Sequence, residues 1–430
     1  MGTLYSDIYI DGMNTEILAA EGAQIKEAWL NGECIWKLAD PKIQIDHITY
    51  YGGMYYAIGS DINSYGNRAW CFLFGKTLDK LTEYPSVLGM SNRLDIERFY
   101  ADSDGIYQEK NNTYAYGTAK VAEYQTIKVQ LINELGTVDT SYNALFMDFG
   151  KSGLSKNMRT NFYSSEMGYC FADSESYSVT HIFQNSLDGT GIHRTEINTE
   201  TENCAYSALY IMGSELLLTY QSNGSALECS YEDYAKGKRL RIPIFKCLNM
   251  NFTEKYNIYY DITKYYEEDL RKSGDMHDAK YTALIYESIY IQRTNAIIML
   301  LYAHDNSKGY KKWILLEYRN GRFVEKRLPQ EPKDLYPLTD GFIVDYADSR
   351  LCAFMQSLES DCVEFALPDD IYHENLGVSK TCRGIFIRGN KLCLNKNNLP
   401  VGYIDTYEVD LSSGTVENVI YDIALKVEED

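Results

Sequence analysis

Short apolar runs separated by turn residues recur along most of the chain, and helical periodicity is scarce. After residue 40 one order keeps returning: a turn, a strand-like run, a polar loop, a second strand-like run, and a turn into a third. The longest purely apolar run is "AIIMLLYA", residues 296–303. Runs of this length between turn residues are typical of β-strands. The pattern therefore predicts an all-β fold.

The recurring unit is found in seven copies, spaced in the mid-fifties of residues with one longer interval. Two copies share a tryptophan four residues after a glycine, "GNRAW" from Gly66 and "GYKKW" from Gly309. A repeat of this size with three or four strands is typical of a propeller blade. We predict a β-propeller of about seven blades over residues 39–430. Six or eight blades would fit if one copy is miscounted, and a sandwich or β-helix is the alternative architecture.

Residues 1–38 do not follow the repeat. "AWLNGECIWK" (28–37) places Asn31-Gly32 between two strand-like runs, and Asn-Gly is the strongest short-range signal for a two-residue hairpin turn. Pro41 in the following "LADPK" (38–42) disfavours continued strand pairing. We predict a separate N-terminal β mini-domain over 1–38.

A second departure lies at about residues 250–290. "DITKYYEEDLRK" (261–272) has apolar positions near helical spacing and is followed by Ser273-Gly274, which predicts a helical insertion on a blade loop. Tyrosine is unusually frequent, with 39 copies in 430 residues, and eight lie in this stretch. A tyrosine ring with one hydroxyl suits contact with sugars or proteins. The candidate ligand-binding residues are Tyr259, Tyr260, Tyr265 and Tyr266, while Tyr286 and Tyr290 fall at strand spacing and are assigned to the blade core.

The formal net charge of −20 argues against binding to nucleic acid or anionic lipid, because both need a basic surface. No apolar run approaches the ~20 residues of a membrane span, and the start, "MGTLYSDIYIDG", lacks the features of a secretory signal. The ten cysteines include no CxxC pair, which predicts free thiols and synthesis in a reducing cytoplasm.

Sequence motifs of catalysis are missing. The six histidines show no metal-ligand spacing, and "HDNSKG" (304–309) is interpreted as a polar turn. We predict no catalytic residue, no metal site and no cofactor, and a non-enzymatic protein. A propeller glycosidase stays open as an alternative, because its carboxylates come from different blades and leave no local motif.

The N-terminal segment resembles short modules on tail and baseplate proteins of phages and prophages of Gram-positive bacteria. The matching residues are Ile8, Tyr9, Ile10, Asp11 and Gly12, then Trp29, Asn31, Gly32, Ile35 and Trp36. The resemblance implies a structural, receptor-binding component of a virion or phage-tail-like particle. The second group would anchor it to other particle proteins, and the propeller would face a host-surface glycan or protein. The alternatives are a carbohydrate-active enzyme on the same scaffold and a purely structural protein that bridges subunits.

Overall fold

The computed structural model describes most of the chain between residues 18 and 426. The described segments are 18–20, 23–25, 27–30, 33–37, 43–62, 68–78, 81–84, 96–102, 105–116, 119–132, 137–149, 163–164, 168–176, 179–185, 192–198, 204–222, 226–228, 231–266, 280–291, 293–305, 310–347, 349–374, 376–396, 402–423 and 425–426.

Seven sheets of four or five strands follow one another along this part of the chain, and two small sheets have two strands each. The strands of the first four large sheets are β5 (Ile43–Tyr51), β6 (Met54–Ile62), β7 (Arg68–Gly75) and β8 (Leu81–Tyr84); β9 (Ile96–Asp102), β10 (Gly105–Tyr116), β11 (Ala119–Ile132) and β12 (Thr137–Phe149); β13 (Tyr163–Ser164), β14 (Gly168–Ser176), β15 (Val179–Asn185) and β16 (Ile192–Asn198); and β17 (Cys204–Met212), β18 (Glu215–Ser222), β20 (Arg241–Leu248) and β21 (Glu254–Asp261).

The fifth to seventh sheets complete the series. They contain β19 (Ala226–Glu228), β22 (Lys280–Ile291), β23 (Ala296–Asp305), β24 (Tyr310–Arg319) and β25 (Arg322–Arg327); β26 (Pro332–Leu338), β27 (Gly341–Tyr346), β28 (Leu351–Met355) and β29 (Val363–Ala366); and β30 (Cys382–Arg388), β31 (Lys391–Lys396), β32 (Tyr403–Asp410) and β33 (Val416–Asp422). The labelled helices are short, α1 (Tyr231–Ala235) and α3 (Val378–Thr381). The prediction of an all-β fold is confirmed.

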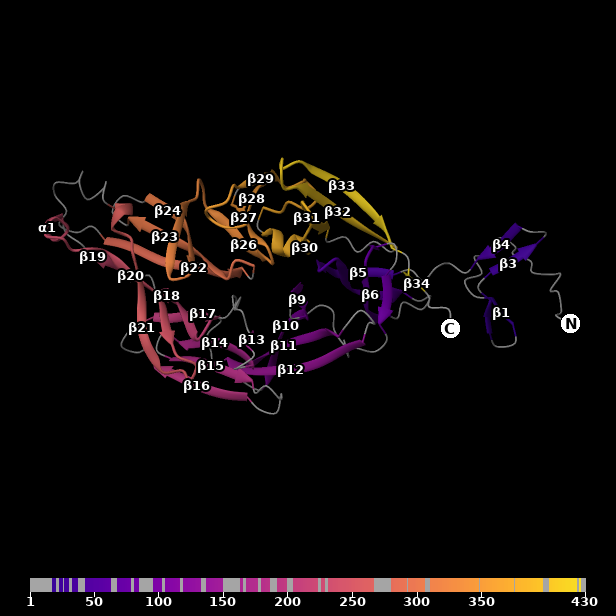
Figure 1. Ribbon diagram of the computed structural model, residues 1–430, viewed down its shortest axis with the longest axis horizontal. Helices are drawn as coiled ribbons and strands as arrows, with labels where there is room; N and C mark the ends of the chain where they lie inside the picture. The colour runs from indigo at the N-terminus through magenta and orange to yellow at the C-terminus, as the bar shows by residue number, and fades with distance from the viewer. Residues whose placement is uncertain are drawn as a thin grey trace.

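Several neighbouring sheets touch through their first long strands; in the fifth sheet this is β22, because β19 has only three residues. β22 contacts β26, β26 contacts β30, and β30 contacts β5 of the first sheet. β34 (Leu425–Lys426), near the end of the described chain, pairs with β8 of the same first sheet. Figure 1 shows β22, β26 and β30 along the inner side of one row of sheets, with β5 next in that row. The last sheet therefore packs on the first through β30 and β5, and the strand that follows the last sheet in sequence, β34, pairs with the first.

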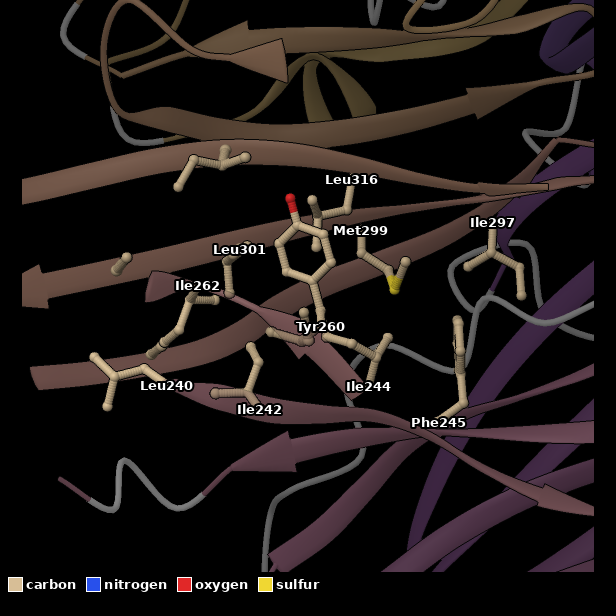
Figure 2. Packing of buried hydrophobic residues seen from close by; sticks show 14 of the residues in the cluster. Leu240, Ile242, Ile244, Phe245, Tyr260, Ile262, Ile297, Met299, Leu301 and Leu316 are labelled. Atoms are coloured by element: carbon tan, nitrogen blue, oxygen red, sulfur yellow. The ribbon is translucent and has the colours of Figure 1, made fainter. Parts of the chain in front are cut away.

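The described core consists of layers between successive sheets. One layer joins the β17–β21 and β22–β25 sheets, and Figure 2 shows its side chains, with the Tyr260 ring standing among Leu301, Leu316 and Ile242. A second layer joins the β22–β25 and β26–β29 sheets. In β23, Met299 and Leu301 enter the first layer and Ile298 and Leu300 the second. Burial on both faces explains why this strand is continuously apolar in sequence.

Buried carboxylates join successive sheets as well. The Glu287 side chain on β22 accepts a hydrogen bond from Leu335 N on β26 at 3.3 Å. Glu317 on β24 accepts from Leu358 N at 2.7 Å. Both carboxylates are less than 10% exposed. A buried carboxylate is stable only when it is hydrogen-bonded or paired, so these two contacts fix the β22–β25 sheet against the β26–β29 sheet.

The two departures from the repeat are described in part. β3 (Glu27–Leu30) and β4 (Glu33–Lys37) form the predicted hairpin with Leu30 opposite Glu33, and Asn31 and Gly32 between them lie outside the described residues. β1 (Leu18–Ala20) and β2 (Ala23–Ile25) form the other small sheet. The helix predicted over 261–272 is helical at 263–266, and 267–279 lie outside the described residues. Strands β21 and β22 occupy much of the range expected to be an insertion. Along the described chain, no helix is long and apolar enough to cross a membrane.

Candidate functional site

The first long strands of several sheets share a β-bulge in the described chain. Tyr286 is skipped in the pairing of β22 with β23, Lys333 in that of β26 with β27, and Arg383 in that of β30 with β31. The same irregularity skips Asp46 on β5, and further bulges occur at corresponding positions on β9 and β17. Bulges re-aim a side chain out of the strand alternation and are common beside functional sites. We therefore take the bulged row, defined as Tyr286, Lys333 and Arg383, as the candidate site.

Tyr286 is the aromatic residue of this row, and 56% of its surface is exposed. Its ring meets the Trp313 ring edge-on, with centroids 5.5 Å apart. Trp313 also packs against Tyr302 at 4.7 Å, and Tyr302 lies 5.9 Å from the ring of His304. Trp313 itself is only 8% exposed, so it holds Tyr286 from below. The result is an exposed ring on a rigid aromatic support.

Lys333 lies on the next first strand. Its Nζ donates to the backbone carbonyl of His373 at 3.1 Å and lies 5.1 Å from the centre of the Tyr372 ring. Arg350 lies over the same ring at 5.5 Å and forms an ion pair with Asp369. The Tyr372 ring thus packs against two cationic side chains of the β26–β29 sheet region, Lys333 and Arg350.

The carboxylates beneath this row are turned inward. Asp345 on β27 is 1% exposed, accepts a hydrogen bond from Val378 N at 3.0 Å, and lies 3.7 Å from the Sγ atom of Cys352. Burial raises the pKa of Asp345 to about 6, although the Val378 amide and the nearby Lys333 charge act to lower it. Asp345 therefore links the β26–β29 sheet to α3 and is not presented to a ligand.

The four tyrosines predicted to bind a ligand have different surroundings. Tyr259 is 53% exposed, whereas Tyr260 and Tyr266 are 8% and 1% exposed. The hydroxyls of Tyr260 and Tyr265 lie 2.9 Å apart, and both donate to Glu325 on β25. The Tyr266 hydroxyl donates to the Thr282 carbonyl at 3.2 Å. Three of the four hydroxyls are thus engaged within the protein, and Tyr259 alone among these four offers an open ring.

Tyr286 was assigned to the blade core by its strand spacing from Tyr290, and this assignment is wrong. Tyr290 follows the alternation: it packs on the core and its hydroxyl donates to the Asn295 side chain at 2.8 Å. The bulge lies between Ile285 and Glu287 and shifts Tyr286 out of register. The sequence carries no direct sign of the bulge, although two polar residues, Glu287 and Ser288, interrupt the apolar run beside it.

The proposed anchor residues Trp29, Asn31, Gly32, Ile35 and Trp36 have no described side chains. In the backbone pairing, Trp36 lies opposite Ala28 and Trp29 opposite Cys34. No group of three or more His, Cys, Asp or Glu residues that could hold a metal ion is found in the described segments.

No family model matches this chain, and no curated protein matches it. Solved structures do match at low similarity. AztD from Citrobacter koseri has 9% identity, with 89% of this chain and 95% of that chain covered and a TM-score of 0.35. A puromycin-hydrolyzing peptidase of Mycobacterium tuberculosis has 11% identity, 90% and 54% coverage and a TM-score of 0.35. The polysaccharide lyase Uly1 has 10% identity, 94% coverage of both chains and a TM-score of 0.31.

The prediction of a phage-tail component is corrected by this comparison. The structures reported above are AztD, a peptidase and a polysaccharide lyase, and none of the three is a tail protein. Identities near 10% and TM-scores of 0.35 or less transfer no substrate, activity or partner to this chain.

Proposed function

We propose that this chain is a seven-bladed β-propeller that binds a carbohydrate at the bulged row. The propeller is supported by seven successive sheets, by contacts between the first strands of neighbouring sheets, and by the contact of β30 with β5. Pairing of β34 with β8 adds a second link between the two ends of the series. Closure of this kind leaves only short sheet edges, as a large all-β domain requires.

The observation that carries the binding proposal is the exposed Tyr286 ring on Trp313. A tyrosine ring offers an apolar face and a hydroxyl at little cost in conformational entropy, which suits the mixed apolar and polar surface of a sugar. Among the described residues, the Tyr286 side chain makes a ring contact with Trp313 and no hydrogen bond. Both the ring face and the hydroxyl are therefore available to a ligand.

The burial and hydrogen bonding of the nearby carboxylates favour binding over hydrolysis. Glycoside hydrolysis needs two carboxyl groups flanking the scissile bond. Glu287, next to Tyr286, and Asp345, opposite Asp334 in the pairing of β26 with β27, are both buried. Glu287 accepts the Leu335 N–H of the next sheet, and Asp345 accepts the Val378 N–H of α3. Their hydrogen bonds serve the packing of the sheets, so they are poorly placed to act on a bound sugar.

The test is a binding screen of the full chain against immobilised polysaccharides, followed by titration calorimetry with the best oligosaccharide. Tyr286→Ala should weaken binding about tenfold, since one aromatic contact contributes on the order of 1 kcal/mol. Tyr286→Phe should keep most of the affinity, because it retains the ring.

Tyr259→Ala is the matched control, because Tyr259 is 53% exposed and lies on β21, the last strand of its sheet. Its affinity should equal that of the unchanged protein. Equal binding by Tyr286→Ala, or loss only in Tyr259→Ala, would overturn the proposed site. Release of shorter sugars during the screen would show an enzyme instead.

A further inference from the structure

We infer that the carbohydrate carries a negative charge, recognised by Lys333 beside the Tyr286 ring; this inference rests on the proposed function. The chain as a whole has a formal net charge of −20, which repels anions at a distance. An anionic ligand therefore needs a local cation at its site, and the bulged row provides one.

Tyr286 and Lys333 occupy corresponding positions on adjacent first strands. The residue after Tyr286, Glu287, accepts a hydrogen bond from Leu335 N, two residues after Lys333. Both Tyr286 and Lys333 are the skipped residues of their bulges. Packed sheets lie about 10 Å apart, so one extended oligosaccharide can reach from the tyrosine ring to the ammonium group.

The charge of Lys333 is not cancelled by a direct partner. Among the described residues, its Nζ has no carboxylate at ion-pair distance and is held by the His373 carbonyl at 3.1 Å. The Tyr372 ring lies below it at 5.1 Å. These contacts position the ammonium group and leave its remaining donors for a ligand.

Other charged side chains near Lys333 do have partners or are buried. Arg350 is paired with Asp369, and Lys396 is paired with both Asp370 and Asp405. Asp345 is buried beneath the row and bound to Val378 N. Asp334, the residue after Lys333, lies against Gly377, where an added Cβ would come within 2.7 Å of its carboxylate.

Arg383 adds a second cationic side chain to the row, on the first strand that follows. It is half-buried, like Lys333. The order along the three strands is thus an open aromatic ring, a lysine and an arginine. A saccharide bearing carboxylate, sulfate or phosphate groups would bring an anion to Lys333, whereas a neutral saccharide offers the lysine no opposite charge.

The test uses chemically matched pairs that differ in charge: oligogalacturonate and its methyl ester, and hyaluronan oligosaccharide and its carboxyl-reduced form. The charged member of a pair should bind about tenfold tighter than the neutral member. Lys333→Gln should remove this preference, and Lys333→Arg should retain most of it. Lys238→Gln, at a 51% exposed lysine just after α1, is the control and should leave the preference unchanged.

Each outcome has a distinct meaning. Equal binding of charged and neutral members, with binding still lost in Tyr286→Ala, would overturn the anionic ligand and leave the carbohydrate site standing. A preference for charge that survives in Lys333→Gln would also overturn the inference. Absence of binding to every member, or binding that does not depend on Tyr286, would overturn the proposed function itself. Thermal unfolding of each variant separates lost contacts from lost folding.

Discussion

Replacing Asp345 by Asn should make the protein more stable at neutral pH, and the gain should depend on pH. Asp345 is 1% exposed and accepts a hydrogen bond from Val378 N at 3.0 Å. Asn keeps an acceptor for that amide and removes the cost of burying a charge. The substitution therefore isolates the electrostatic part of this contact between β27 and α3.

The magnitude follows from the pKa of Asp345, which burial raises from 3.8 to about 6. Between these values the folded protein binds more protons at this site than the unfolded chain does. Stability consequently falls as the pH rises from about 4 to about 6, and the loss is complete above the folded pKa. At 1.36 kcal/mol per pKa unit, the loss is about 3 kcal/mol. Asn does not titrate, so the advantage of Asp345→Asn should grow by that amount between pH 4 and pH 7.

The assay is chemical denaturation of both proteins at several pH values, with hydrogen exchange over residues 373–381 as a local measure. Any constant cost of the Asn amide cancels when the two pH values are subtracted. Asp410→Asn is the control, because hydrogen bonds from Ser412 lower the pKa of Asp410, opposite to the shift at Asp345. A difference between Asp345→Asn and the unchanged protein that stays constant from pH 4 to pH 7 would refute the reasoning.

Further outcomes are expected. Gly384→Ala should lower stability by about 1–3 kcal/mol in denaturation, because the new Cβ would lie 2.4 Å from the Ile48 carbonyl oxygen; unchanged stability would contradict the close packing of β30 on β5. Removing residues 425–430 should lower the thermal midpoint and expose the β5–β8 sheet to protease, since β34 pairs with β8; an unaltered digestion pattern would argue against that pairing. Deleting residues 1–38 should leave the remaining chain folded by circular dichroism, and its aggregation would show that the N-terminal segment belongs to the main fold. All ten cysteines should react as thiols after denaturation without reductant, and a mass corresponding to any disulfide would contradict this.

Sequence patterns identified the strands best where burial is strongest. Residues 296–303 are apolar throughout because β23 is buried between two sheets, and the turn residues on either side limit its length. The hairpin at 28–37 was also readable, since two-residue turns have narrow chemical requirements. Both features depend on residues close together in the chain, and such short-range patterns can be recognised in a single sequence.

The candidate site could not be predicted in the same way. A bulge is a property of two paired strands, and it moved Tyr286 out of the core position that its spacing from Tyr290 predicts. The tyrosines of residues 259–266 were expected near the surface of a helix. Tyr260 instead belongs to β21 and points into the layer between two sheets, where Glu325 from β25 takes its hydroxyl. That partner is 65 residues away, and no local pattern identifies it.

The bulges also bear on how this surface can change over evolutionary time. A residue inside a regular strand is in register with the strands on both sides, so replacing it disturbs the packing of a layer. Tyr286, Lys333 and Arg383 each stand outside that alternation, one to a sheet. Mutations at these three positions therefore disturb the strand pairing of the layers less than mutations at regular strand positions do. The same scaffold can thus acquire a new specificity through a few substitutions, while the layers beneath it stay under separate selection for stability.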